Sequence, residues 1–296
     1  MKKSLFCEKR GMTRREFVKT TAVGTAGLAF MNWAKAEVQA NQKYPYWGKV
    51  VVARDDSATD GPKINTQVVS SLLEEAVNAL TDGQGWRAIF PVIKPEDTVA
   101  IKINAMTYVK LITNEEVLDA IVIKLIDIGF NPGNIIVFDG DASVSKVTSL
   151  EMPSIRKKGV RILETGAGGE GFDPKSQTPF LDGTEVRLSR IITESNHLIN
   201  VPVLKTHSGG SGVTFALKNH VGSIDNPRLV HKGLAAFTGI KPGSIAAINN
   251  LQGIKEKTRL IVGDSLLGIY QGGPFGNPQF AYNGLIVGTD PVAVDH

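Results

Sequence analysis

The sequence predicts an α/β fold with a mainly parallel sheet and helices on both faces, a Rossmann-like three-layer arrangement. Short apolar runs bounded by turn residues recur along the chain, as buried strands do. Segments with helical spacing of apolar residues lie between several of these runs. The length of 296 residues is sufficient to bury a sizeable core.

The first half of the chain alternates strand and helix patterns. Strands are expected at 48–54, 98–103 and 134–138. Helices are expected at 65–80 and 114–128, the second with Glu115 and Glu116 in its first turn. Gly129 follows it and suits the left-handed position at a helix end.

The second half continues with apolar runs and one further helix pattern. Strands are expected at 160–163, 197–204, 260–262 and 285–287, and a helix is expected to begin near Val213. Near the end, Asp290 and Pro291 form a helix start, with an N-cap residue and a proline at the first helical position. The sequence does not complete this helix, so we expect the C-terminus to be truncated.

The N-terminal 36 residues predict a twin-arginine signal peptide. Thr13-Arg14-Arg15-Glu16-Phe17-Val18-Lys19 precedes an apolar stretch, 20–33, and then Ala34-Lys35-Ala36, a cleavage site of the small-x-small type. The alternatives are an amphipathic first helix or a membrane anchor. The apolar stretch is short for a membrane span, which needs roughly 20 residues. We therefore divide the chain into a signal peptide (1–36, cleaved after Ala36), a linker (37–47) and one α/β domain (48–296).

This leader sets the expected location and the charge of the mature protein. We expect a periplasmic or extracellular protein that meets the twin-arginine translocase during export and has no stable membrane span. Of 33 basic and 29 acidic residues, eight and two lie in the leader; the remaining 25 and 27 give a net charge of about −2. That charge argues against a nucleic-acid partner.

Cysteine content limits the possible cofactors. The only cysteine, Cys7, lies in the leader. The mature segment therefore contains no ligand for a cysteine-bound iron–sulfur cluster and no cysteine nucleophile. The sequence does not identify a cofactor.

Two Lys-x-His units surround a glycine-rich turn in residues 204–224. Lys205 and His207 come before Gly209, Gly210 and Gly212, and Lys218 and His220 come after them. A strand, a glycine-rich turn and a helix N-terminus together offer backbone N–H groups to an anion. With a helix starting near Val213, Leu217 would pack on the core while Lys218 faces the ligand. We therefore predict a site for an anionic small molecule.

Histidine spacing leaves a metal site as an alternative. His207, His220 and His231, with a carboxylate such as Asp264, would suit a first-row divalent metal. The spacings match no standard motif, and His220 lies beside the apolar face, where a structural, hydrogen-bonded histidine is the stronger interpretation.

Five stretches resemble a known family. They are Val99–Asn104, His197–His207, Gly212–Gly222, Gly272–Gly276 and Asp290–Asp295. The sequence resembles the domain-of-unknown-function family three-six-two over roughly residues 48–296. The resemblance implies an α/β domain, and some members carry ferredoxin-like cysteine clusters, which this sequence lacks. Its shared polar positions map onto Asn104, Lys205, His207, Lys218, Asn219, Asp264, Asp290 and Asp295.

The leading hypothesis is an exported enzyme that binds an anionic small molecule or cofactor. His207 would act as general acid or base, and Asp264 or Asp295 would orient it. The expected ligand-binding residues are Asn104, Lys205, Gly209, Gly210, Gly212, Lys218 and Asn219. The alternative is a periplasmic ligand-binding or metal-binding protein without catalysis.

Overall fold

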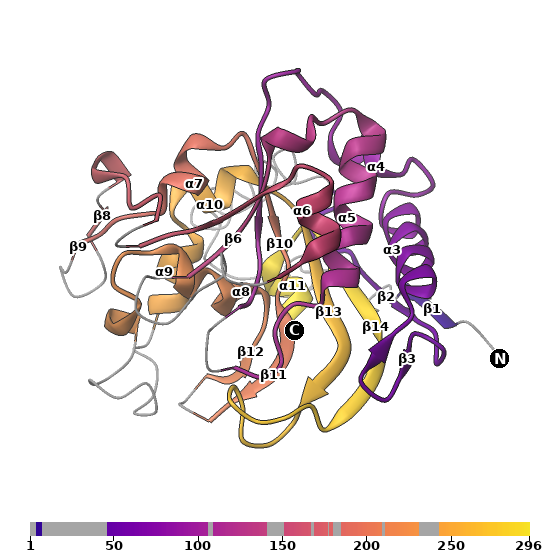
Figure 1. Ribbon diagram of the computed structural model, residues 1–296. Helices are drawn as coiled ribbons and strands as arrows, with labels where there is room; N and C mark the ends of the chain where they lie inside the picture. The colour runs from indigo at the N-terminus through magenta and orange to yellow at the C-terminus, as the bar shows by residue number, and fades with distance from the viewer. Residues whose placement is uncertain are drawn as a thin grey trace, which may run out of the picture.

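A mixed sheet forms the centre of the molecule (Figure 1). The computed structural model describes residues 4–7, 46–105, 109–140, 151–166, 169–176, 178–179, 185–208, 211–230 and 243–296. The order of the strands is β1-β2-β14-β13-β10-β5-β6-β7, with β11 pairing with β13 and β12 pairing with β11. Neighbouring strands from β13 through β10, β5 and β6 to β7 run parallel, whereas β2, β14 and β13 pair antiparallel.

The strands of this sheet have the following bounds: β1 Ser4–Cys7, β2 Val50–Arg54, β5 Val99–Lys102, β6 Ile135–Asp139, β7 Arg161–Glu164, β10 His197–Asn200, β11 Val203–His207, β12 Gly212–Thr214, β13 Thr258–Ile269 and β14 Phe280–Gly288. Two small hairpins lie outside it: β3 Thr59–Asp60 with β4 Lys63–Ile64, and β8 Thr178–Pro179 with β9 Glu185–Val186.

Helices cover the sheet on both sides, which confirms the predicted fold class (Figure 1). One side carries α3 Thr66–Leu80, α4 Trp86–Ile89, α5 Glu115–Ile128 and α6 Pro153–Lys157, and the other carries α7 Arg190–Glu194, α9 Ser244–Asn249 and α10 Gln252–Lys257. The shorter elements α8 Ala216–Asn219, α11 Pro291–Asp295, η1 Pro132–Asn134, η3 Pro174–Ser176, η4 His220–Ser223 and η5 Pro227–Val230 complete the described part.

Side chains of one strand alternate between two separate hydrophobic clusters. In β5, Val99 and Ile101 pack with α3 and α5, whereas Ala100 packs with α7, α9 and α10. In β6, Ile136 and Phe138 likewise join the second cluster. Such runs are apolar at every position because both faces of the strand are buried.

The predicted helix ends are confirmed at several positions. Asn65 accepts a hydrogen bond from the N–H of Val68 and caps α3. Gly129 is left-handed and ends α5. Asp290 caps α11 by accepting from Val292 and Ala293.

The prediction of a helix beginning near Val213 is wrong. Gly212–Thr214 is the strand β12, which pairs antiparallel with β11, and the helix α8 begins only at Ala216. The glycine-rich segment therefore joins the strands of a hairpin, and the β-branched Val213 and Thr214 favour extended backbone. Val213 is 52% exposed.

The single strand expected at 197–204 is interrupted. It forms β10 and β11, separated by Val201 and Pro202. The long strand β13 pairs with both, and the N–H of Asp264 donates to the carbonyl of Pro202 at the break.

The predicted signal peptide falls almost entirely outside the described residues. Of residues 1–36, only Ser4–Cys7 is described, as β1, paired antiparallel with β2. Removal of a signal peptide ending at Ala36 would make β2 the edge strand. Within the described residues, no helix has the length and hydropathy to span a membrane.

Candidate functional site

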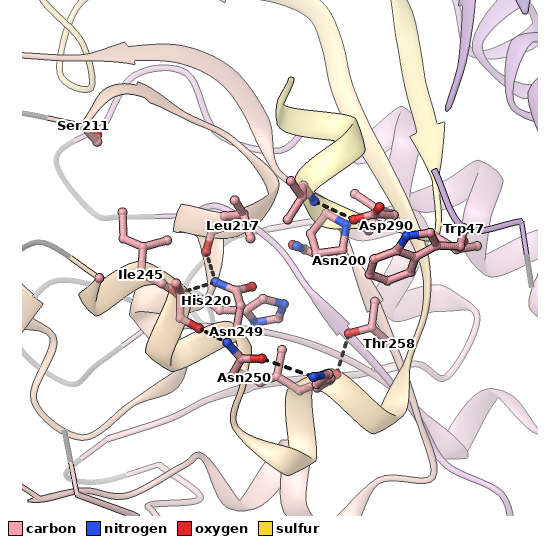
Figure 2. Close-up of a pocket in the computed structure, with 18 residues that line it drawn as sticks. Trp47, Asn200, Ser211, Leu217, His220, Ile245, Asn249, Asn250, Thr258 and Asp290 are labelled. Atoms are coloured by element: carbon pink, nitrogen blue, oxygen red, sulfur yellow. Dashed lines mark hydrogen bonds between the residues drawn. The ribbon is translucent and has the colours of Figure 1, made fainter. Parts of the chain in front are cut away.

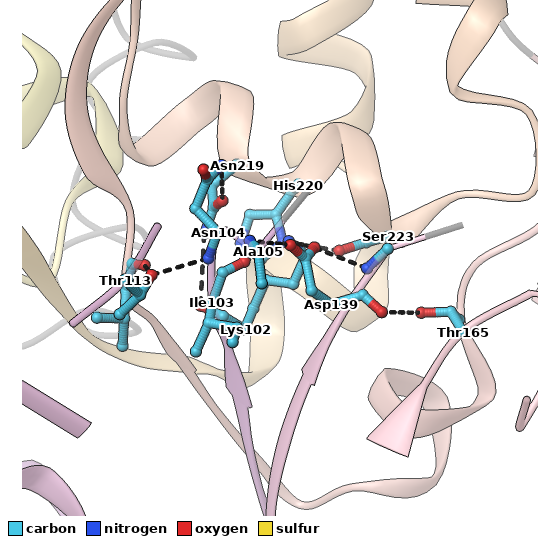
Figure 3. A network of polar contacts seen from close by, with 12 residues as sticks. Lys102, Ile103, Asn104, Ala105, Thr113, Asp139, Thr165, Asn219, His220 and Ser223 are labelled. Atoms are coloured by element: carbon cyan, nitrogen blue, oxygen red, sulfur yellow. Dashed lines mark hydrogen bonds and ion pairs between the residues drawn. The ribbon is translucent and has the colours of Figure 1, made fainter. Parts of the chain in front are cut away.

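Polar and charged side chains gather where β5 and β6 end (Figure 3). Lys102 ends β5, Asp139 ends β6, and both are buried. The Lys102 ammonium forms an ion pair with the Asp139 carboxylate and donates to the carbonyl of Ile103 over 2.7 Å. The carboxyl ends of parallel strands are where open α/β sheets place their ligands.

Asp139 also accepts hydrogen bonds from the main chain. The N–H groups of Ala105 and Gly140 both donate to its carboxylate. Burial lowers the pKa of Lys102, and the charge of Asp139 opposes this effect. A Cβ on Gly222 would lie 3.0 Å from Oδ1 of Asp139 and 3.3 Å from Nζ of Lys102, so η4 closes directly over the ion pair.

Three asparagines extend this network toward β11 and α8. Nδ2 of Asn104 donates to Oδ1 of Asn219 over 3.2 Å, and Nδ2 of Asn219 donates to Oδ1 of Asn200 over 2.8 Å. Asn200 in turn donates to the carbonyl of Ala216 over 2.8 Å. These amides fix α8 against the ends of β5 and β10. Asn104 and Asn219, both predicted as ligand-binding residues, therefore lie together.

Lys205 joins the same cluster from β11. Its ammonium donates to Oδ1 of Asn104 and, over 2.9 Å, to the carbonyl of Leu111. Both acceptors are neutral, although the side chain is only 2% exposed. Burial lowers the pKa of Lys205 to about 7; Asp139 and Asp264 oppose the shift, and Lys218 and Lys102 add to it.

Lys218, on α8, is the third lysine of this region, and we call Lys102, Lys205 and Lys218 the cation cluster. The side chain is half-buried, and no described residue forms a hydrogen bond or ion pair with its ammonium. Burial lowers its pKa to about 8. Its charge also lowers the pKa of Lys205, so the two ammonium groups lie near one another. The structure thus brings Asn104, Lys205, Lys218 and Asn219 together.

The two histidines differ in their surroundings. His207 ends β11, is 7% exposed, and lies two residues after Lys205, so both side chains leave the same face of the strand. His220 is fully buried, and its Nδ1 lies 3.2 Å from Oγ of Ser223. Burial lowers the pKa of His220 to about 3, with a contribution from Lys102, so this imidazole is neutral at physiological pH. The structural interpretation of His220 is supported.

Asp264 and Asp295 both hold main-chain elements in position. Oδ2 of Asp264 accepts from the N–H and Nδ2 of Asn114, each over 2.8 Å, and ties the start of α5 to β13. Asp295 accepts from the N–H groups of Ala216 and Leu217 over 2.6 and 3.0 Å and caps α8. Burial raises the pKa of each carboxyl to about 6. Their expected role, orienting His207, stays a prediction.

Of the glycines in the predicted anion site, only Gly212 lies in the described part of the chain. Gly212 belongs to β12, and Gly209 and Gly210 lie outside the described residues. The N–H groups at the start of α8 already bind the carboxylate of Asp295. A helix N-terminus is thus not open to a ligand here, because α8 follows a strand and receives its cap from α11.

The metal alternative receives no support from the described part of the chain. There, no three His, Cys, Asp or Glu side chains gather closely enough to hold a metal ion. His231 lies outside that part. The proposed set of His207, His220 and His231 therefore stays a prediction.

Asn200 is a network residue that was not predicted from the sequence. It is the last residue of β10 and is 1% exposed. A polar residue that directly follows apolar strand residues was the available signal, and the same signal applies to Lys102 and Asp139.

The family model of a domain of unknown function, DUF362, matches residues 99–296, which is more than half of the chain. The chain belongs to the DUF362 family. The match includes the parallel strands, the lysines Lys102, Lys205 and Lys218 and the asparagine network, so the site lies within the family's own domain. No curated protein matches the chain.

Among solved structures, a crystal structure of a protein from Thermotoga maritima is similar to this DUF362 protein. The TM-score is 0.46 and the sequence identity is 12%. The alignment covers 82% of this chain and 58% of that one, so this chain spans less than two thirds of the length of its neighbour.

Proposed function

We propose that this DUF362 protein is an exported enzyme that binds a small anionic molecule beside Lys205 and Lys218 and transfers a proton to or from it. The observation that carries the proposal is that neither of these two ammonium groups forms an ion pair with a described residue. Lys102 is paired with Asp139, whereas Lys205 has neutral hydrogen-bond partners and Lys218 has no partner among the described residues.

An anion would relieve an unfavourable arrangement. Removing a positive charge from water is costly unless an opposite charge compensates for it. Lys205 and Lys218 also repel one another. A phosphate or carboxylate bound between them would supply the missing negative charge, and the amides of Asn104 and Asn219 add hydrogen-bonding groups at the same place.

The pKa of Lys205 and the position of His207 support proton transfer. Lys205, with a pKa of about 7, exchanges a proton close to neutral pH. His207 is the general acid or base that we propose, since it leaves β11 on the same face as Lys205. The substrate would be an anion with an exchangeable proton, and the reaction class is acid–base catalysis.

Anion binding is tested with inorganic phosphate and with acetate by isothermal titration calorimetry at low ionic strength. We expect Lys218→Met and Lys205→Met to weaken binding at least tenfold because each removes a charge next to the anion. The control is Lys63→Met, which changes an exposed lysine on β4. Unchanged binding in both site variants, or no binding by the unmodified protein, would exclude the proposed anion site.

His207→Asn separates an enzyme from a binding protein. Once a substrate has been found among anionic metabolites, this variant is expected to keep anion binding and to lose at least a hundredfold in turnover. Binding without any turnover in the unmodified protein would favour the non-catalytic alternative.

Export is tested at the twin arginines. Arg14→Lys combined with Arg15→Lys is expected to leave the protein in the cytoplasm at full length, while the unmodified protein appears outside it, cleaved after Ala36. Cell fractionation followed by mass spectrometry of the N-terminus distinguishes these results. An exported protein with an intact N-terminus would instead support the membrane anchor.

A further inference from the structure

A cavity lies on the side of α8 that carries α9, α10 and α11 (Figure 2). Its volume is about 600 Å³, within the range of roughly 300–1,000 Å³ that is usual for small-molecule sites. Neither Lys205 nor Lys218 lines it. It touches the polar network only through Asn200 and His220. This cavity is therefore distinct from the proposed anion site.

Apolar side chains from several elements form much of its wall. Leu217 comes from α8, Ile245 from α9 and Ile254 from α10. Trp47, Ile261, Pro291 and Val292 add further apolar surface. Because these elements meet from different parts of the chain, the cavity exists only in the assembled fold. A ligand with an apolar body would remove this surface from water.

The charged side chains in the lining are already engaged by the protein. Asp290 caps α11, and the ammonium of Lys255 donates to Oδ1 of Asn250 over 3.3 Å. The imidazole of His220 is held by Ser223 and is neutral at physiological pH. Lys255 is exposed, so solvent screens its charge, and the buried part of the described lining holds no uncompensated charge that would select an ion.

Two polar atoms in the lining residues, Oγ of Ser211 and Oδ1 of Asn249, are buried without a hydrogen-bond partner in the described part of the chain. Nδ2 of Asn249 donates to the carbonyls of Leu217 and Ile245, each over 2.8 Å (Figure 2). Oδ1 of the same amide is buried and accepts no hydrogen bond within the described part of the chain. A buried acceptor without a donor is costly, so an occupant that brings an N–H or O–H group would gain from it.

We propose that this cavity binds a neutral, mainly apolar small molecule that donates one hydrogen bond to Asn249. The apolar wall favours a ligand with an apolar body, and the lack of an uncompensated charge in the buried part of the described lining favours a neutral one. The unpaired Oδ1 favours a ligand that donates a hydrogen bond. The ligand class differs from the anion of the proposed function, so the two sites can be tested independently.

The probe for the test is N-phenyl-1-naphthylamine, a neutral aromatic molecule with one N–H, whose fluorescence rises in apolar surroundings. We expect saturable binding to the full chain. Ala246→Trp places a large side chain at the cavity wall from an exposed position of α9 and should weaken binding at least tenfold. Val292→Trp, at a position that is 46% exposed, is a second filling variant from α11.

The control variant is Val92→Trp, which adds the same side chain at a position that is 68% exposed and outside the cavity. It should bind the probe as the unmodified protein does, and circular dichroism should show that all three variants are folded. Absence of saturable binding, or equal binding by folded Ala246→Trp and Val292→Trp proteins, would overturn the proposal.

The hydrogen bond to Asn249 is tested with a matched pair of probes. The N-methyl derivative of the same amine has no N–H, so the unmodified protein should bind it several-fold more weakly. Asn249→Leu removes the acceptor and should abolish this difference between the two probes. Equal affinity of the unmodified protein for both probes would contradict the assignment of Asn249.

Discussion

Replacing Asp139 with asparagine is expected to lower the free energy of unfolding by about 3–5 kcal/mol. The variant leaves the ammonium of Lys102 buried without its counter-charge, at a position that is 1% exposed and covered by η4. The shape of the side chain is preserved, so the loss would come from the charge and from a main-chain hydrogen bond that the amide NH2 cannot accept, and not from a cavity. Urea denaturation at pH 7 measures it.

Two controls make this result specific. Asp82→Asn removes the same charge from the Lys49–Asp82 pair, where the Asp82 side chain is 75% exposed, and should cost less than about 1 kcal/mol. Lys102→Met combined with Asp139→Asn should recover much of the stability, because the uncompensated charge is then absent. A loss in Asp139→Asn no larger than that in Asp82→Asn would show that the buried pair is not formed.

The second large effect is expected in the pH dependence of stability. The pKa of Lys205 is about 7 in the folded protein and ordinarily 10.5. Between these values the unfolded chain binds more protons than the folded one, so stability rises with pH in this window. The contribution of Lys205 is at most about 1.4 kcal/mol per pH unit.

Lys205→Met should remove this contribution, so its free energy of unfolding should rise less steeply than that of the unmodified protein from pH 7 to 10. Asp264 and Asp295, with pKa values of about 6, titrate mainly below this range and do not obscure the comparison. The exposed-lysine variant Lys63→Met should keep the original slope. Denaturation curves at several pH values give the slopes, and identical slopes for Lys205→Met and the unmodified protein would refute the prediction.

Sequence patterns were sufficient for the parallel part of the sheet and its helices. The strands β5 and β6 are apolar at nearly every position because both faces are covered, and this property is visible locally. The caps at Asn65, Gly129 and Asp290 were predictable for the same reason, since a cap depends on residues close in sequence.

The region after His207 was not predictable in this way. Residues 212–214 follow a glycine-rich segment that suits either a hairpin or a loop before a helix, and pairing with β11 decides between them. The cap of α8 comes from Asp295, far along the chain. Partners so distant in sequence leave no local pattern.

The candidate site was predicted as a set of residues but not as a geometry. The structure brings Lys205, Lys218, Asn104 and Asn219 together, as the repeated Lys-x-His units and the family resemblance indicated. The sequence placed the glycine-rich turn at the centre of the site. In the structure, the Lys102–Asp139 pair and the three asparagines occupy that position.

The position of β14 in the sheet has a consequence for biosynthesis. Among the described strands, β2 pairs with β1 and β14, and β14 begins at Phe280. The segment of β2 and α3 therefore leaves the ribosome long before its partner strand exists. Contacts this distant in sequence slow folding. The helix α3 packs on β2, α5 and β14, so the nascent chain would leave the part of its apolar face that packs on β14 uncovered until that strand has been synthesised. A chaperone that binds this helix would protect the chain during that interval.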